Sequence, residues 1–145
     1  MDLIKAIIAG WSWLGCKPQT IVAHSPFGNV VFMDMDGAYW RLIPESLKCE
    51  VIAGNREAFE ALWSTEDFQE DWKAVRFCDM ARSVNGELDE GRSYCLKLKD
   101  VLGGQYAVEN MGTIGTTELI ESSGHMAFQI KDLPDGTPFK ITITR

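Results

Sequence analysis

Two apolar runs separated by an Asp-Gly pair constrain the fold of this chain more than any other feature. The runs are residues 29–34 and 38–43, and Asp36-Gly37 lies between them. Asp-Gly readily adopts the backbone angles of a short turn that joins neighbouring antiparallel strands. The sequence therefore predicts a hairpin with a two-residue turn. Pro44 ends its second strand, and residues 49–53 are a candidate third strand.

Helical periodicity lies on both sides of these strands in the sequence. Residues 3–14 have the spacing of a short amphipathic helix, and further helices are expected to begin after Asn55, after Thr65 and at Thr116 or Thr117. The second of these three runs to about Arg82. The apolar residues that the three helices are expected to bury are Phe59, Leu62, Trp63, Phe68, Trp72, Val75, Leu119, Ile120, Ala127 and Ile130.

Short strands are also expected late in the chain, over residues 93–98, 106–108 and 139–143. Strands first, helices in the middle and strands mixed with a helix at the end are typical of an α+β fold. At 145 residues the chain has the length of one domain. We therefore predict a single α+β domain over residues 1–145, with an antiparallel sheet packed against about three to four helices.

The acidic residues of this chain are concentrated in one segment. The net charge is −7, and residues 57–90 hold ten carboxylates but three basic side chains, which accounts for the whole excess. This balance argues against nucleic acid or an anionic membrane as the ligand. No apolar run approaches the roughly 18 residues of a membrane-spanning helix. The acidic segment is either a solvated helical face or a docking surface for a basic partner.

In the second case the binding side chains would lie on the outer side of the helix that begins after Thr65. Residues three and four apart share a helical face, so these carboxylates point away from Phe68 and Trp72. The candidate partner-binding residues are Glu66, Asp67, Glu70, Asp71 and Asp79.

The four cysteines are Cys16, Cys49, Cys78 and Cys95, and no two of them form a Cys-x-x-Cys pair. Structural zinc uses closely spaced ligands, so we expect no metal and no cofactor. Free thiols in a chain of this size are typical of a reducing compartment, which predicts a cytoplasmic protein.

Asp34 and Asp36 raise one enzymatic alternative. An apolar strand followed by Asp-x-Asp-Gly resembles the first motif of haloacid-dehalogenase-type phosphatases, in which the two aspartates act beside magnesium. In this chain Ala38 replaces the usual threonine, and no later acidic pair follows an apolar strand. A hairpin turn explains the same residues, so we expect a protein that is not an enzyme.

Several strings resemble the C-terminal domain of type VI secretion immunity proteins, which protect bacteria from secreted DNase toxins. The resemblance extends over about residues 11–145, and its most specific string is the last one. The strings lie at residues 27–31, 37–45, 94–97, 101–106, 110–114 and 129–136.

This resemblance implies a cytosolic inhibitor without enzymatic activity that binds a cognate toxin, and a short form without the GAD-like domain often fused ahead of it. It assigns no toxin-contacting residues, so the five carboxylates above rest on charge alone. A generic interaction module with another partner is the remaining alternative.

Overall fold

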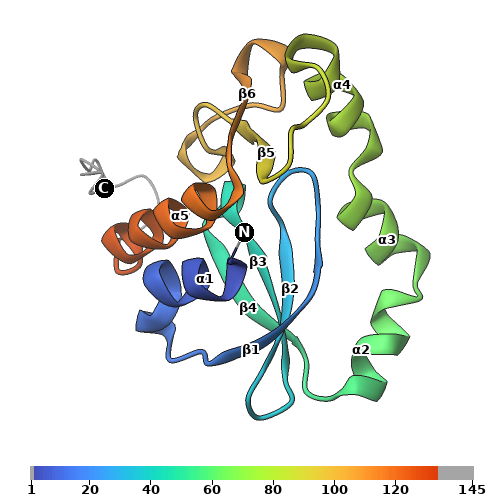
Figure 1. The fold of residues 1–145 in the computed structure, drawn as a ribbon, viewed down its shortest axis with the longest axis vertical. Coiled ribbons are helices and arrows are strands. Elements are labelled where there is room, and N and C mark those ends of the chain that lie inside the picture. Colours follow the sequence, from blue (N-terminus) through green and yellow to red (C-terminus); the bar gives the residue numbers. More distant parts are fainter. Residues whose placement is uncertain (1, 134–145) are drawn as a thin grey trace.

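The computed structural model describes residues 2–133, and two antiparallel sheets run through this part of the chain (Figure 1). The larger sheet has four strands in the order β1-β2-β3-β4, and the smaller pairs β5 with β6. The strands are β1 (Pro18–His24), β2 (Val30–Asp34), β3 (Tyr39–Ile43), β4 (Lys48–Ala53), β5 (Arg92–Leu96) and β6 (Met111–Gly115).

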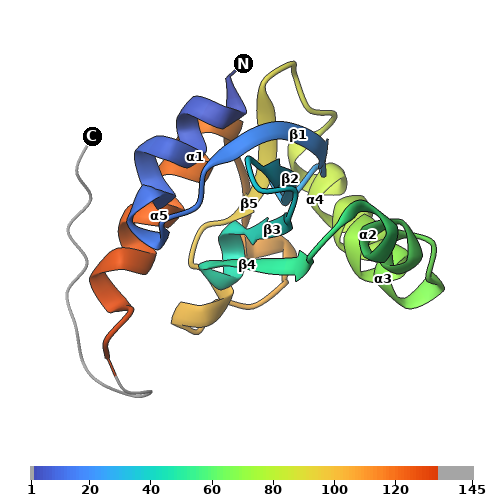
Figure 2. The same cartoon turned by 90° about the horizontal axis from the view of Figure 1, so that it is seen from below.

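Helices cover both faces of the larger sheet. Figure 2 shows α1 and α5 side by side on one flank and α2 and α3 on the other, with the strands between them. The helices are α1 (Leu3–Trp11), α2 (Arg56–Trp63), α3 (Glu66–Lys73), α4 (Val75–Asn85) and α5 (Thr116–Ile130). Four single 3-10 turns are η1 (Ser12–Leu14), η2 (Pro44–Ser46), η3 (Asp100–Leu102) and η4 (Val108–Asn110). The predicted α+β fold class is confirmed.

The predicted hairpin is present, but its turn differs in length. β2 pairs with β3 through the Met33 and Tyr39 register, and the Asp34 N–H donates to the Ala38 carbonyl. The hydrogen bond between Asp34 and Ala38 encloses residues 35–37, so the loop has three residues and not two. Gly37 has a φ of 87°, which suits glycine at the end of a three-residue hairpin loop.

Strand β1 was not predicted from the sequence. It lies at the edge of the sheet and pairs only with β2 among the described strands. Most of its side chains are exposed or half-buried, and irregularities interrupt its register. An edge strand of this kind lacks the regular apolar alternation on which strand prediction depends.

Helices α1 and α5 pack closely against each other and against the sheet. Trp11 is fully buried, and its indole Nε1 donates to the Ile120 carbonyl at 3.0 Å. Gly10 and Gly124 face each other where the two helices cross, and a Cβ on either would overlap the backbone of the other helix. Helices α1 and α5 thus form one wall of the main core. Its fully buried residues include Ile7 of α1 and Val30, Phe32 and Leu42 of the sheet.

Aromatic side chains fill the opposite face of the sheet. Phe59 of α2 stacks on Tyr39 with ring centroids 4.3 Å apart, and Trp63 contacts both Phe59 and Trp72. Phe59 and Trp72 are buried, as the periodicity predicts. The expectation for Val75 was wrong, because its side chain is 60% exposed.

The helix expected over residues 65–82 is two helices, which explains the exposure of Val75. Ala74 has a φ of 42°, in the left-handed region, and separates α3 from α4. This break turns α4 toward the smaller sheet, where Cys78 and Ala81 pack with Tyr94, Leu96 and Met111. Because of this break, the described range contains five α-helices, where about three to four were predicted.

Two expected late strands have different outcomes. Residues 106–108 are not a strand, because the chain forms a loop and η4 before pairing as β6. The strand expected at 139–143 lies outside the described residues. The next helix, α5, begins at Thr116 as predicted.

Candidate functional site

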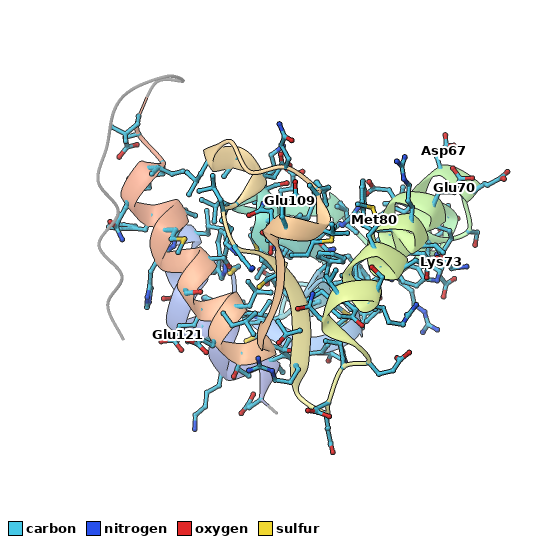
Figure 3. All side chains as sticks on the ribbon, turned by 90° about the horizontal axis from the view of Figure 1, so that it is seen from above. Asp67, Glu70, Lys73, Met80, Glu109 and Glu121 are labelled. Carbon is cyan, nitrogen blue, oxygen red and sulfur yellow. The ribbon has the colours of Figure 1, made fainter. Side chains whose placement is uncertain are left out.

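The acidic residues singled out from the sequence lie on the outer side of α3 and on α4. Thr65 caps α3, because its Oγ1 accepts the Phe68 N–H, and Glu66 and Asp67 occupy the first turn, where the helix dipole favours negative charge. Figure 3 shows Asp67 and Glu70 pointing outward from this helix. All five candidate carboxylates are exposed.

Asp71 differs from its neighbours because it forms an ion pair with the sheet. Its Oδ2 lies 2.6 Å from Nη1 of Arg41, a residue of β3 whose side chain is 10% exposed. The Arg41 guanidinium also lies over the rings of Phe68 and Trp72, 5.3 Å and 5.4 Å from their centroids. Arg41 therefore anchors α3 to the sheet through both charge and aromatic contact.

Sequence reasoning did not find Arg41. The available signal is a charged residue in the middle of the apolar strand Tyr39–Ile43. A buried guanidinium requires compensating partners, so this position predicts a partner carboxylate or aromatic ring elsewhere in the chain.

Asp79 lies on α4, and its Oδ1 is 2.9 Å from Nη1 of Arg82. Arg82 also contacts Glu87 at 3.1 Å. Among the five candidates, Asp71 and Asp79 thus have basic partners. Within residues 2–133, no basic side chain forms an ion pair with Glu66, Asp67 or Glu70. These three carboxylates, which we call the α3 acidic surface, are available to an external cation.

The geometry of Asp34 does not suit a phosphatase nucleophile. Its Oδ1 accepts the N–H groups of Asp36 and Ala38 at 2.8 Å and 3.0 Å, and its Oδ2 accepts the indole N–H of Trp40 at 2.8 Å. Burial opposes ionisation of this carboxyl, but these hydrogen bonds outweigh it and hold its pKa below the ordinary value. Asp34 thus stabilises the hairpin loop.

We expect Asp34→Ala to lower the free energy of unfolding by about 2 kcal/mol at pH 7, because three donors lose their acceptor. The depressed pKa means that this stabilisation is present above pH 3.8 and is lost as the pH falls below it, so wild type and variant should converge in acid. Urea unfolding at several pH values measures this. Asp36→Asn is the control and should stay within about 0.5 kcal/mol of wild type, because Asp36 is exposed. An equal loss in both variants would contradict the assignment.

A buried ion pair joins η2 to the segment after β5. Lys99 Nζ lies 3.4 Å from Glu45 Oε1, and the two side chains are 9% and 3% exposed. Burial raises the pKa of Glu45, while the Lys99 charge and the Leu96 N–H oppose that rise. The local sequence contains no signal for this pairing, because the partners are 54 positions apart.

The four cysteines are free thiols, and three of them are buried. Cys16 and Cys49 both lie in the main core, and the interaction with Cys16 together with burial raises the pKa of Cys49. Residues 2–133 contain no group of three side chains suited to hold a metal ion. No helix in this range is long and apolar enough to cross a membrane.

The comparison with solved structures agrees with this fold, whereas the comparison with curated proteins found no match. A solved structure described as "Crystal structure of Atu4351 from Agrobacterium tumefaciens" is similar to this chain, with a TM-score of 0.54 and 19% identity. The match covers 84% of this chain and 62% of that one, so this chain spans less than two thirds of the length of that protein.

A family profile identifies the chain more specifically. The profile described as "T6SS immunity protein Tdi1, C-terminal" matches residues 53–127, which is more than half of the sequence. The matched range runs from the end of β4 into α5 and includes all five candidate carboxylates. The chain therefore belongs to the family of C-terminal domains of the type VI secretion system immunity protein Tdi1.

Proposed function

We propose that this chain is a cytosolic immunity protein that binds and neutralises a type VI secreted toxin, and that the toxin is a DNase. The family match over residues 53–127 is the observation that carries this proposal. In this proposal the chain acts by binding alone and catalyses no reaction. The exposed α3 acidic surface and the hydrogen-bonded Asp34 support binding over phosphatase chemistry.

The charge pattern favours a nuclease as the partner. An enzyme that binds DNA carries a basic groove for the phosphate backbone. Glu66, Asp67 and Glu70 place three carboxylates on adjacent turns of one helix, with no ion-pair partner among the described residues. Such a surface complements a basic groove and would also steer the two proteins together.

Asp71 and Asp79 have a smaller part in this proposal. Asp71 lies near the end of α3, and its ion pair with Arg41 keeps this helix on the sheet. Asp79 already has an ion-pair partner in Arg82, which also contacts Glu87. Both residues would contribute to the negative potential of this side of the molecule, while the α3 acidic surface makes the direct contacts.

The decisive variant changes the α3 acidic surface and leaves Asp71 intact. We expect Glu66→Gln/Asp67→Asn/Glu70→Gln to slow association with the cognate toxin about tenfold at low salt, because steering is lost. The dissociation rate should change less than threefold. Stopped-flow association with a catalytically inactive toxin at several salt concentrations measures both the rate and its salt dependence.

The matched control is Glu50→Gln/Asp89→Asn/Glu90→Gln, which makes the same change in net charge at exposed positions outside α3 and α4. It should leave the association rate within about twofold of wild type. If both triple variants slow association equally, net charge rather than the α3 acidic surface governs recognition. If the wild-type chain binds no toxin and protects no cell from one, the proposed function is wrong.

A further inference from the structure

A groove of about 580 Å³ lies between α5 and the chain that follows β5. This volume is within the range of sites that enclose a ligand or a large side chain. The groove is mainly apolar, and the apolar side chains that line it are Leu96, Leu98, Leu102, Ile114, Leu119 and Met126.

The wall of this groove is held in place by the structure. Lys99 lines the groove, and its buried ion pair with Glu45 holds its side chain in place. The Leu98 backbone is fixed by Asn110, whose Oδ1 accepts the Leu98 N–H at 2.9 Å and whose Nδ2 donates to the Leu98 carbonyl at 3.0 Å. The groove is therefore preformed, which lowers the entropic cost of binding.

The surroundings of the groove indicate the chemistry of its occupant. Leu98, which lines the groove, and Val101, which lies close to it in sequence, are 48% and 50% exposed. On the α5 side, Glu118 and Glu121 lie one turn apart, and no described residue forms an ion pair with either of them. Lys97 lies on the opposite wall. An apolar floor with two carboxylates along one lip complements an apolar side chain that has a basic neighbour.

We propose that this groove binds an apolar side chain of the toxin, a leucine, methionine or phenylalanine flanked by lysine or arginine. This inference rests on the proposed function and assigns the toxin a second contact, on α5. A side chain inserted into a preformed apolar pocket is the usual form of an interface hot spot. The toxin then contributes an apolar anchor in addition to its basic surface.

The groove and the α3 acidic surface lie on opposite flanks of the molecule. Viewed from above in Figure 3, Glu121 of α5 and Glu70 of α3 lie to either side, and Glu109 of η4 lies between them. Helix α4 contacts β6 and η4, and α5 contacts β5 and β6, so the smaller sheet lies between α4 and α5. A toxin that contacts both surfaces must therefore extend across this part of the molecule.

The two surfaces have different kinetic roles. Exposed charges mainly change the rate of association, whereas a buried apolar anchor mainly changes the rate of dissociation. We therefore expect variants of the α3 acidic surface to slow binding and variants of the groove to speed release.

The test fills the groove. Ser122 of α5 lines it and is half-buried, so Ser122→Phe places a ring where the toxin side chain would sit. We expect the toxin to dissociate at least tenfold faster, with an association rate within threefold of wild type. Ser12→Phe introduces the same ring at an exposed position in η1 and should leave both rates unchanged. Surface plasmon resonance with the catalytically inactive toxin measures them.

A second variant covers the case in which Ser122→Phe fails to fold. Leu98→Ser removes an exposed apolar side chain that lines the groove and leaves the hydrogen bonds of the Leu98 backbone in place. It should also speed dissociation, by about threefold or more. Unchanged dissociation in a folded Ser122→Phe variant and in Leu98→Ser overturns the proposal.

The remaining outcomes separate other occupants and other failures. A Ser122→Phe variant that unfolds at lower temperature without its toxin, with unchanged toxin dissociation, shows that the chain fills its own groove. Self-association of the wild type that Ser122→Phe abolishes, again with unchanged toxin dissociation, makes a second copy the occupant. Either result overturns the proposal. If the α3 variant slows association but groove variants release toxin normally, the groove inference fails and the proposed function stands.

Discussion

Replacing Lys99 with methionine is expected to lower the free energy of unfolding by about 3–5 kcal/mol near neutral pH, because the variant leaves the Glu45 carboxylate buried without its counterion. The Glu45 side chain is 3% exposed, and its nearest cation is Lys99 Nζ at 3.4 Å. Methionine retains most of the length of the lysine side chain, so the loss reports the charge and not a cavity. Urea unfolding followed by tryptophan fluorescence measures it.

The pH dependence of this loss identifies its cause. Burial already raises the pKa of Glu45 in the wild type, and removing Lys99 raises it further. Between the ordinary and the raised pKa the folded chain binds more protons than the unfolded chain, so stability falls as pH rises. The deficit of Lys99→Met should therefore be smaller at pH 5 than at pH 8.

The double variant Glu45→Gln/Lys99→Met is the matched control. It removes both charges, so we expect it to recover at least half of the loss and to show no difference in deficit between pH 5 and pH 8. A single variant as stable as wild type at pH 8 would show that water solvates Glu45 and that the pair is not effectively buried.

Gly124→Ala is the second change with a large expected effect, a loss of about 3 kcal/mol and roughly 10 °C in unfolding midpoint. A Cβ at this position would overlap the Gly10 carbonyl, and one at Gly10 would lie 2.6 Å from the Glu121 carbonyl oxygen. Backbone atoms on both sides leave no flexible side chain to move away. The helices must separate instead, and that separation disturbs the hydrogen bond from Trp11 to Ile120.

The sign of this effect is informative, because alanine favours an isolated helix over glycine by about 1 kcal/mol. Gly54→Ala is the control, since its Cβ would meet no atom within 4 Å and its φ lies outside the left-handed region. It should be neutral or slightly stabilising. Thermal unfolding of both variants is sufficient, and a Gly124→Ala variant that is more stable than wild type would disprove the close crossing.

Local signals in the sequence predicted much of the fold. Asn55 and Thr65 were identified as helix caps, and each accepts a backbone N–H three residues later. The hairpin and the start of α5 at Thr116 rest on similarly local patterns. These features depend on residues close together in the chain, so their chemistry can be read before the fold is known.

Features that depend on distant residues were missed. Edge strand β1 takes its structure from pairing with β2 and not from its own composition. The break at Ala74 places a non-glycine residue in the left-handed region, which no local pattern indicates. The ion pair of Arg41 with Asp71 and the groove along α5 both form where elements far apart in the sequence meet. The exposure of the acidic residues was predicted correctly, but the pairing of Asp71 with Arg41 was not.

The close crossing of α1 and α5 determines when this protein can complete its fold during synthesis. Helix α1 (Leu3–Trp11) is made before the other described elements, yet its main partner α5 (Thr116–Ile130) is more than 100 residues away in the chain. While the ribosome makes the residues between them, the apolar face of α1 has no α5 to cover it. Joining such distant segments also slows folding. Under the proposed function, a partly made chain without α5 lacks one wall of the groove and the partner of α1, so we expect it to give no protection.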